Sequence, residues 1–428
     1  MRDLLLLFVL ATLAPIVNAQ EKPQDEIKKD IRCSASNYMA YPGPARQLTP
    51  APEGWEPFYI SHYGRHGSRY HNKPTIYEIP CDILAAADSA GKLTPLGKDA
   101  LRRLRAVRDD AVDQWGELTE LGAQQHRQII RRMAERFPEV FQGSTNVDAR
   151  STTVIRCILS MENAMQELTR LNPKLNIHHN ATHRDMWYLN QQDQHLFSMK
   201  MDSTTQATYN AFARKYEKND RLMQSLFNDT AYIRKHVDTG KLNYFIFKVA
   251  SNIQSTHMDR LVTLYDLFTE EEIYHNWKKE NAWWYIAFGG STINGGLQPY
   301  TQRNLLRKII NDADSCIQLK RTSVQLRFGH ETIIMPLTCL LDLNGYGLAT
   351  DRLEELDSLG WANYRIFPMA SNIQFIFYRR NTNDRDVVFK VLLNENEVTL
   401  PLKTQHPPYY RWDDFREYFL KKLDAYNG

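Results

Sequence analysis

Strand-like and helix-like patterns alternate at both ends of this chain, and a long helical stretch separates the two ends. Segments rich in β-favouring residues occur at 58–62, 146–149, 323–328, 373–378, 387–393 and 397–400, and helical patterns lie between several of them. From about residue 174 to 290 the chain is polar, rich in Asn and Gln, and mostly helical in pattern. This alternation predicts an α/β core, at 20–173 and 291–428, interrupted by a mainly helical cap at 174–290.

Residues 1–19 have the composition of a cleavable secretory signal. Arg2 precedes an apolar run from Leu4 to Val17, and small residues end the segment at Ala19. Such a segment is too short and wrongly flanked for a membrane-spanning helix. We therefore expect cleavage after Ala19 and a secreted or periplasmic protein without membrane association. The charged and polar residues from Gln20 to about 30 predict a flexible lead.

The charge balance and the cysteine content argue against several functional classes. The chain has 53 basic and 50 acidic residues and a formal net charge of +3, which disfavours a nucleic-acid-binding protein. Its five cysteines are an odd number without CxxC spacing, so at least one thiol is free. No metal-ligand motif occurs in the sequence. We expect a monomer that binds a small molecule and uses neither a metal nor a cofactor.

The loop Arg65-His66-Gly67-Ser68-Arg69 follows the strand predicted at 58–62. A loop at the carboxyl end of a strand lies at the edge where open α/β sheets bind ligands. Two arginines flank one imidazole here, and guanidinium groups bind phosphate oxygens in bidentate fashion. Nearby positive charge disfavours protonation of His66, and a neutral imidazole is a nucleophile. The pattern indicates a phosphate site with a histidine nucleophile; a loop with incidental charge is the alternative.

Three further segments follow this loop in order along the chain. They are Leu118-Thr119-Glu120-Leu121-Gly122, then Ser151-Thr152-Thr153-Val154-Ile155-Arg156 with Ser160, then Phe328-Gly329-His330-Glu331-Thr332. With the first loop, they resemble the ordered motifs of the histidine acid phosphatases: RHGxRxP, LTxxG, STxxxR…S and a late His-Asp or His-Ala-Glu. The resemblance spans most of residues 58 to 400. It implies a central mixed sheet flanked by helices, with the helical cap inserted, and a metal-independent phosphomonoesterase.

Carried over by position, the resemblance assigns roles to six residues. His66 would attack phosphorus and form a phosphohistidine, while Glu331 would protonate the leaving group and then activate water. The phosphate ligands would be Arg65, Arg69, Arg156 and His330. Two positions depart from the family pattern. His71 stands where the motif has proline, as a ligand donor or as an exposed loop residue, and Glu331 follows His330 directly, where most members have the shorter Asp.

Within the family, the chain most resembles the multiple inositol polyphosphate phosphatases. The likeness rests on Tyr70 beside Arg69, on the Phe-Gly-His context and on the run from Val391 to Glu395. It implies an inositol polyphosphate such as phytate as substrate, and its additional phosphates would require additional cationic side chains. Candidates are His71, Lys73, His183 and Arg184, although plain surface charge also explains the last three.

Two other functions use the same residues. A broad-specificity acid phosphatase would rely on the same machinery and differ only in substrate. A non-catalytic protein that captures anions is the alternative from a different class. Binding alone would not require an acid such as Glu331 next to the phosphate, and this disfavours the second alternative.

Overall fold

The computed structural model describes residues 21–190 and 193–426. The expected signal segment 1–19 lies outside the described residues. The strands are β1 (Glu56–Arg65), β2 (Asn146–Ser151), β3 (Asn176–Ala181), β4 (Ser323–Gly329), β5 (Asn372–Arg379), β6 (Val388–Leu393), β7 (Asn396–Val398) and β8 (Tyr410–Arg411). The helices up to residue 226 are α1 (Pro23–Lys29), α2 (Thr75–Ser89), α3 (Pro95–Asp110), α4 (Glu120–Arg136), α5 (Ile155–Leu171), α6 (Met186–Leu189), α7 (Gln194–Met199), α8 (Ser203–Arg214) and α9 (Asp220–Leu226). The later helices are α10 (Thr230–His236), α11 (Thr239–Ile253), α12 (Glu270–Phe288), α13 (Arg303–Gln318), α14 (Glu331–Leu340), α15 (Asn363–Ile366) and α16 (Trp412–Asp424).

The strands form one mixed sheet in the order β3-β2-β4-β1-β5-β6-β7, with β8 also paired to β6. Neighbouring strands from β3 to β1 run parallel, whereas β5 pairs antiparallel with β1 and with β6. The expected central mixed sheet flanked by helices is confirmed. Parallel pairing brings the carboxyl ends of β1, β2 and β4 to the same edge, and the loops that follow these strands carry the motifs identified in the sequence.

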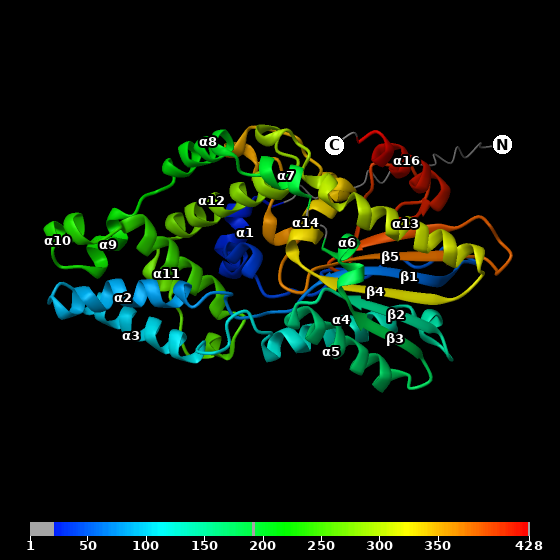
Figure 1. The fold of residues 1–428 in the computed structure, drawn as a ribbon, viewed down its shortest axis with the longest axis horizontal. Coiled ribbons are helices and arrows are strands. Elements are labelled where there is room, and N and C mark those ends of the chain that lie inside the picture. The colour runs from blue at the N-terminus through cyan, green and yellow to red at the C-terminus, as the bar shows by residue number, and fades with distance from the viewer. Residues whose placement is uncertain (1–20, 191–192, 427–428) are drawn as a thin grey trace, which may run out of the picture.

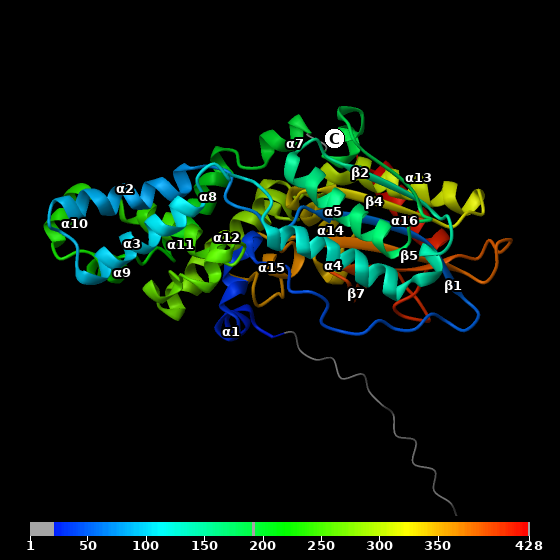
Figure 2. The same ribbon diagram turned by 90° about the horizontal axis from the view of Figure 1, so that it is seen from below.

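Helices cover both faces of the sheet (Figures 1 and 2). Successive residues of a strand point to opposite faces, so Tyr59 and Ile60 of β1 enter different cores. Ile60 packs in a core with Met133 of α4 and Met165 of α5. Tyr59 packs in another core with side chains of α13, α14 and α16. Burial on both faces explains the apolar run of β5 from Phe375 to Tyr378.

A second, helical lobe lies at the other end of the molecule, to the left in Figure 1. Its core combines Leu84 of α2 and Leu104 of α3 with Leu226 of α9, Ile246 of α11 and Trp277 of α12. Helix ends within it are capped locally. Thr269 and Glu272 form a reciprocal capping box at the start of α12, which satisfies backbone N–H groups that the helix itself leaves unpaired. None of the helices in the described ranges has the length and apolar composition needed to cross a lipid bilayer.

Three expectations about local structure differ from this arrangement. Residues 176–181, expected to begin the helical cap, form the sheet strand β3, which pairs with β2. Helices α2 and α3, expected in the first part of the core, pack in the helical lobe instead. Residues 23–38, of which the first were expected to be flexible, form α1 and the 3₁₀ segment η1 (Ile31–Tyr38). Ile27 and Tyr38 are buried in the helical lobe's core, which explains why this segment is ordered.

Candidate active site

The carboxyl edge of the parallel strands brings the separated sequence motifs together. Arg65 is the last residue of β1 and pairs in register with Gly329, the last residue of β4. On the other side of β4, Ser151 at the end of β2 pairs with Phe328. The loops that continue from these three strands therefore start side by side, although they are up to 264 residues apart in the chain (329 − 65).

The loop after β1 is fixed by backbone contacts on both sides. The N–H of His66 donates to the carbonyl of Gly329 at 2.9 Å, and the carbonyl of His66 accepts from Ala370 at 3.0 Å. Gly67 packs directly against Gly122 of α4, because a Cβ on Gly67 would lie 2.4 Å from the Gly122 carbonyl oxygen. The LTxxG segment therefore supports the loop through close backbone packing that only glycine allows.

Side chains of two helices complete this support. The N–H of Gly67 donates to Oγ of Ser160 on α5 at 3.1 Å. The N–H of Ser68 donates to Oε1 of Gln125 on α4 at 2.9 Å, and Nε2 of Gln125 returns a hydrogen bond to Oγ of Ser68 at 3.0 Å. Buried N–H groups of an irregular loop need such acceptors, so these residues hold the loop in one conformation.

The imidazole of His66 is fully buried and held in one tautomer. Its Nδ1 lies 2.9 Å from the carbonyl oxygen of Gly67, which can only accept, so Nδ1 carries the proton and Nε2 presents a lone pair. Burial, together with the charges of Arg65 and Arg69, holds the pKa of His66 well below its ordinary value despite the opposing effect of Glu331. His66 is therefore neutral, with a free Nε2 directed into the pocket.

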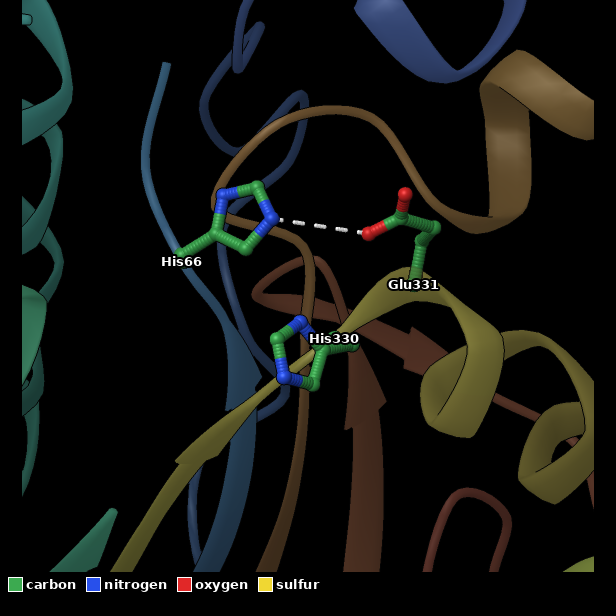
Figure 3. Close-up of side chains that lie close together, drawn as sticks. All are labelled: His66, His330 and Glu331. Carbon is green, nitrogen blue, oxygen red and sulfur yellow. Dashed lines mark ion pairs between the residues drawn. The ribbon is translucent and has the colours of Figure 1, made fainter. Parts of the chain in front are cut away.

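Glu331, the first residue of α14, lies opposite Nε2 of His66 (Figure 3). Its Oε2 is 3.5 Å from His66 Nε2 and 3.1 Å from Nε of Arg65, and its Oε1 is 4.0 Å from Nη2 of Arg69. Burial alone would raise the pKa of Glu331, but the charges of Arg65 and Arg69 hold that pKa well below its ordinary value. The carboxyl group is thus ionised.

One terminal nitrogen of the Arg65 guanidinium is held by backbone carbonyls, and the other is left to bind a ligand in the pocket. Its Nη1 donates to the carbonyl oxygens of Asn37 at 2.6 Å and Phe367 at 2.9 Å. Its Nη2 has no hydrogen-bond partner among the described residues. Burial lowers the pKa of Arg65 to about 10, which still leaves the guanidinium charged at neutral pH. A buried, pre-oriented guanidinium with a free donor is well suited to bind an anion.

Arg156 and His330 border the same pocket. Burial, followed by the charge of Arg69, lowers the pKa of Arg156, the second residue of α5. His330 follows β4 and lies with its ring centroid 5.8 Å from that of His66. Its Nε2 is 3.3 Å from Oγ1 of Thr152, and burial lowers the pKa of His330 to about 4. His330 is neutral at pH 7 and can act as a hydrogen-bond donor.

The charges of the pocket favour an anion over a metal ion. Ligand atoms of His66, His330 and Glu331 lie within 4.8 Å of one another, a spacing that could accommodate a cation. The guanidinium groups of Arg65 and Arg69, however, lie within 4.0 Å of the same carboxylate. These fixed positive charges repel a metal ion and attract an anion. A phosphoryl group fits a pocket in which guanidinium groups outnumber carboxylates.

Comparison with known families agrees with this geometry. The family model of the histidine phosphatase superfamily (branch 2) matches residues 64–394. The chain belongs to this superfamily. The family expected from the four motifs is thereby confirmed, together with the phosphatase class of the enzyme.

Solved structures of a multiple inositol polyphosphate phosphatase and of phytases share the fold. The Bifidobacterium longum multiple inositol polyphosphate phosphatase in complex with inositol hexasulfate superposes with a TM-score of 0.75 at 17% identity, over 90% of this chain and 97% of that one. The phytase from D. castellii gives a TM-score of 0.69 at 13% identity, over 92% and 86% of the two chains. Hafnia alvei phytase in complex with myo-inositol hexakis sulphate gives 0.53 at 13% identity, over 87% and 98%. A search of curated protein sequences gives no match.

The structure of this histidine phosphatase brings six sequence-predicted residues to one pocket: Arg65, His66, Arg69, Arg156, His330 and Glu331. The other candidates lie elsewhere. Lys73, His183 and Arg184 are exposed and do not belong to the buried cluster.

His71 is fully buried, so the interpretation as an exposed loop residue is wrong. Its Nε2 lies 2.8 Å from the carbonyl oxygen of Lys248 on α11, and its ring packs against those of Tyr38 and Tyr77. Burial lowers the pKa of His71 to about 3, so this side chain is neutral. His71 thus joins the loop after β1 to α11 of the helical lobe.

Some residues around the pocket were not identified from the sequence. Tyr38 lies with its ring centroid 5.4 Å from Cζ of Arg69, and Asn37 anchors Arg65, but both belong to the irregular segment η1. Cys157, on α5 after Arg156, donates from Sγ to the carbonyl of Gly329 at 3.2 Å. All five cysteines of this histidine phosphatase are buried free thiols. The sequence offered a signal only for Cys157: it directly follows Arg156 of the STxxxR segment, which places it next to a predicted site residue.

Proposed function

We propose that this histidine phosphatase hydrolyses inositol polyphosphates through a covalent phosphohistidine intermediate on His66. The observation that carries the proposal is the neutral imidazole of His66, whose Nε2 lies 3.5 Å from the carboxylate of Glu331 in a pocket bordered by arginine side chains. A nucleophile, a proton-transfer group and fixed positive charge are the components that phosphoryl transfer needs. A site that only binds anions would not require the first two.

In the first half-reaction, Nε2 of His66 attacks phosphorus and the bond from phosphorus to the leaving oxygen breaks. Arg65, Arg69, Arg156 and His330 are the proposed ligands of the non-bridging oxygens. Glu331, in its protonated form, gives its proton to the leaving alkoxide, which departs as an alcohol. The Nδ1 proton of His66 stays hydrogen-bonded to the carbonyl of Gly67, which stabilises the positive charge that develops on the ring.

Glu331 must first gain a proton, because its pKa lies well below its ordinary value. A bound phosphate dianion competes for the positive charge of Arg65 and brings negative charge close to the carboxylate. Both effects raise the pKa of Glu331. Binding of the substrate thereby converts the carboxylate into an acid, which takes its proton from solvent.

In the second half-reaction, the carboxylate of Glu331 accepts a proton from a water molecule whose oxygen attacks phosphorus. The phosphorus–nitrogen bond breaks, inorganic phosphate is formed and the lone pair returns to Nε2 of His66. General acid–base assistance of this kind contributes about 10²–10⁴-fold to the rate. Positioned cationic donors contribute the larger electrostatic share.

Inositol polyphosphates are the proposed substrate class for two reasons. The motifs of this chain resemble those of the multiple inositol polyphosphate phosphatases. The B. longum protein of that name superposes over 90% of this chain, and it was solved with inositol hexasulfate. Secretion after cleavage at Ala19 is part of the proposal, as is the monomeric state. We also propose that the helical lobe acts as the cap over the substrate.

A substrate panel in the presence of EDTA tests the proposal. We expect kcat/KM for phosphate release to be higher with inositol hexakisphosphate than with sugar monophosphates or an aryl phosphate. The His66→Ala variant should release no phosphate from any of these substrates. His406→Ala, at an exposed position outside the proposed site residues, is the control and should retain full activity. Equal kcat/KM values across the panel would indicate a broad-specificity phosphatase, and strict dependence on added metal would reject the mechanism.

A further inference from the structure

A cavity of about 210 Å³ adjoins the helical turn that carries Glu331. Thr332 and Ile333, the two residues that follow Glu331 on α14, form one wall. Phe197 of α7 and Phe288 at the end of α12 form another, together with Lys200 just beyond α7. Figure 1 shows α7 and α14 at the junction between the sheet and the helical lobe.

Lys200 is the cation of this cavity, and its ammonium group is held by aromatic rings. Its Nζ lies 3.2 Å from the ring centroid of Phe288 and 5.9 Å from those of Phe197 and Trp283. No carboxylate lies within ion-pair distance of this Nζ among residues 21–190 and 193–426. Burial lowers the pKa of Lys200 to about 8. A partly desolvated ammonium without a counter-ion attracts an anion strongly.

The other polar groups that line the cavity leave this charge uncompensated. Asp193 also lines it, but its carboxylate is bound by Arg303 at 2.7 Å. Gln302 is 1% exposed, and its Oε1 has no hydrogen-bond partner in the described part of the chain. Thr332 adds a hydroxyl group. The set provides a cation for a phosphate together with an acceptor and a hydroxyl for neighbouring polar groups of the same ligand.

A second cavity of about 210 Å³ is also lined by a lysine, Lys248, but that lysine differs from Lys200. Lys248 also lies beside an aromatic ring, with its Nζ 5.4 Å from the ring centroid of Tyr38. Its charge is paired with Glu280 at 2.6 Å. A paired charge gains little from binding another anion, because the partner must be displaced or left close to it. Lys200 is therefore the better candidate for ligand binding.

We propose that Lys200 is a specificity-determining residue that binds a second phosphate group of the substrate while the reacting phosphate lies at Arg65, Arg69 and Arg156. The inference rests on the proposed function, since it requires a substrate with more than one phosphate. The two sites are adjacent because Thr332, which lines the cavity of Lys200, directly follows Glu331 of the arginine pocket on α14. The aromatic rings hold the ammonium in place before the ligand arrives, which reduces the entropy lost on binding.

Titration calorimetry on the full chain tests this inference with two ligands, non-hydrolysable inositol hexakissulfate and inorganic phosphate. Lys200→Met keeps a long apolar side chain against Phe288 but removes the charge. We expect it to raise the Kd for the hexakissulfate about tenfold, the scale of one charge-assisted contact. The Kd for inorganic phosphate should change less than about twofold, because phosphate alone fills the arginine pocket. Lys200→Arg should retain most of the hexakissulfate affinity.

Two further variants keep the test decisive. Lys98→Met, at a largely exposed position on α3, changes the net charge equally and should leave both affinities unchanged. Lys200→Gln gives a second measurement of charge removal in case methionine disturbs the packing of the rings. An equal loss of affinity for both ligands, or no loss for either, would overturn the subsite. Lys200-dependent binding of hexakissulfate without hydrolysis of inositol hexakisphosphate would reject the proposed function but leave the subsite intact.

Discussion

The carboxylate of Glu331 lies 3.1 Å from Nε of Arg65, so the proposed proton donor forms an ion pair with a proposed phosphate ligand. Arg65 is fully buried, and the side chain of Glu331 is only 11% exposed. A buried guanidinium without an anion would be costly, and the carboxylate supplies that anion until a phosphate replaces it. Glu331 therefore competes with the substrate for Arg65 before it assists the reaction.

Glu331→Gln should separate these two roles. Removing the acid should lower kcat/KM, which reports formation of the phosphohistidine, by about 10²–10⁴-fold for alkyl phosphates. The loss of kcat/KM should be smaller for an aryl phosphate, whose leaving group needs little protonation. Removing the competing negative charge should at the same time strengthen binding of inorganic phosphate. Steady-state kinetics and the inhibition constant for phosphate measure both effects.

Glu331→Asp is the matched control for this prediction. It retains the charge and the acid but shortens the side chain by one methylene, so phosphate inhibition should stay close to that of the wild type. A Glu331→Gln variant that binds phosphate more weakly, with kcat/KM unchanged, would show that Glu331 is a structural partner of Arg65 and not the acid.

Gly122→Ala tests the backbone contact between α4 and the loop after β1. A Cβ at this position would lie 2.3 Å from the carbonyl oxygen of Ser68, and backbone atoms cannot move away without displacing the loop. We expect a loss of stability of about 1–3 kcal/mol and a fall in kcat that exceeds tenfold. Chemical unfolding and kinetics on the same preparation measure the two effects.

The control for this substitution is Gly240→Ala in α11, where the nearest atoms to a new Cβ are 3.8 Å away. It should be neutral or slightly stabilising, because alanine favours a helix more than glycine does. Full activity in the Gly122→Ala variant would mean that the loop does not depend on the LTxxG segment.

Buried neutral histidines should make the protein less stable as the pH falls. The pKa of His71 is lowered by burial from 6.5 to about 3, so the unfolded chain binds a proton that the folded chain does not. This contribution to stability is fully present above pH 6.5 and is lost progressively as the pH falls towards the folded-state value. A single such group changes the unfolding free energy by about 1.4 kcal/mol per pH unit in this window.

His71→Gln, which keeps an amide donor for the carbonyl of Lys248, should reduce that pH slope by up to one proton equivalent. Urea unfolding at several values between about pH 6 and 4 measures it. His183→Gln, at an exposed position, should leave the slope unchanged. An unaltered slope in the His71 variant would show that His71 is not buried as a neutral group in solution.

Much of the sheet and the central cluster could be predicted from the sequence, because local signals were strong there. The apolar run of β5 marks a strand buried on both faces, and the alternation of apolar and polar residues marks β4. The four ordered motifs mark the pocket. In contrast, β3 was missed because its residues, Asn176–Ala181, are mostly polar and none is buried at the sheet edge, so they show no apolar alternation. Its strand conformation depends on pairing with β2, which no local pattern records.

Burial of individual polar side chains was also beyond local prediction. His71 has polar neighbours in the sequence, and only its packing between Tyr38 and Tyr77 shows that it is part of a core. Likewise, Lys200 looks like an ordinary surface lysine until α7, α12 and α14 come together around it. Such positions are set by tertiary contacts between segments that are distant in the chain.

The most direct test of the account is rapid-quench labelling with a substrate that carries radioactive phosphate. The Glu331→Gln variant with an aryl phosphate is best suited, because its leaving group departs without the acid while hydrolysis of the intermediate is slowed. We predict acid-labile label on the peptide that contains His66, and none in the His66→Ala variant. Label on another residue, or turnover without any covalent label, would contradict the phosphohistidine mechanism.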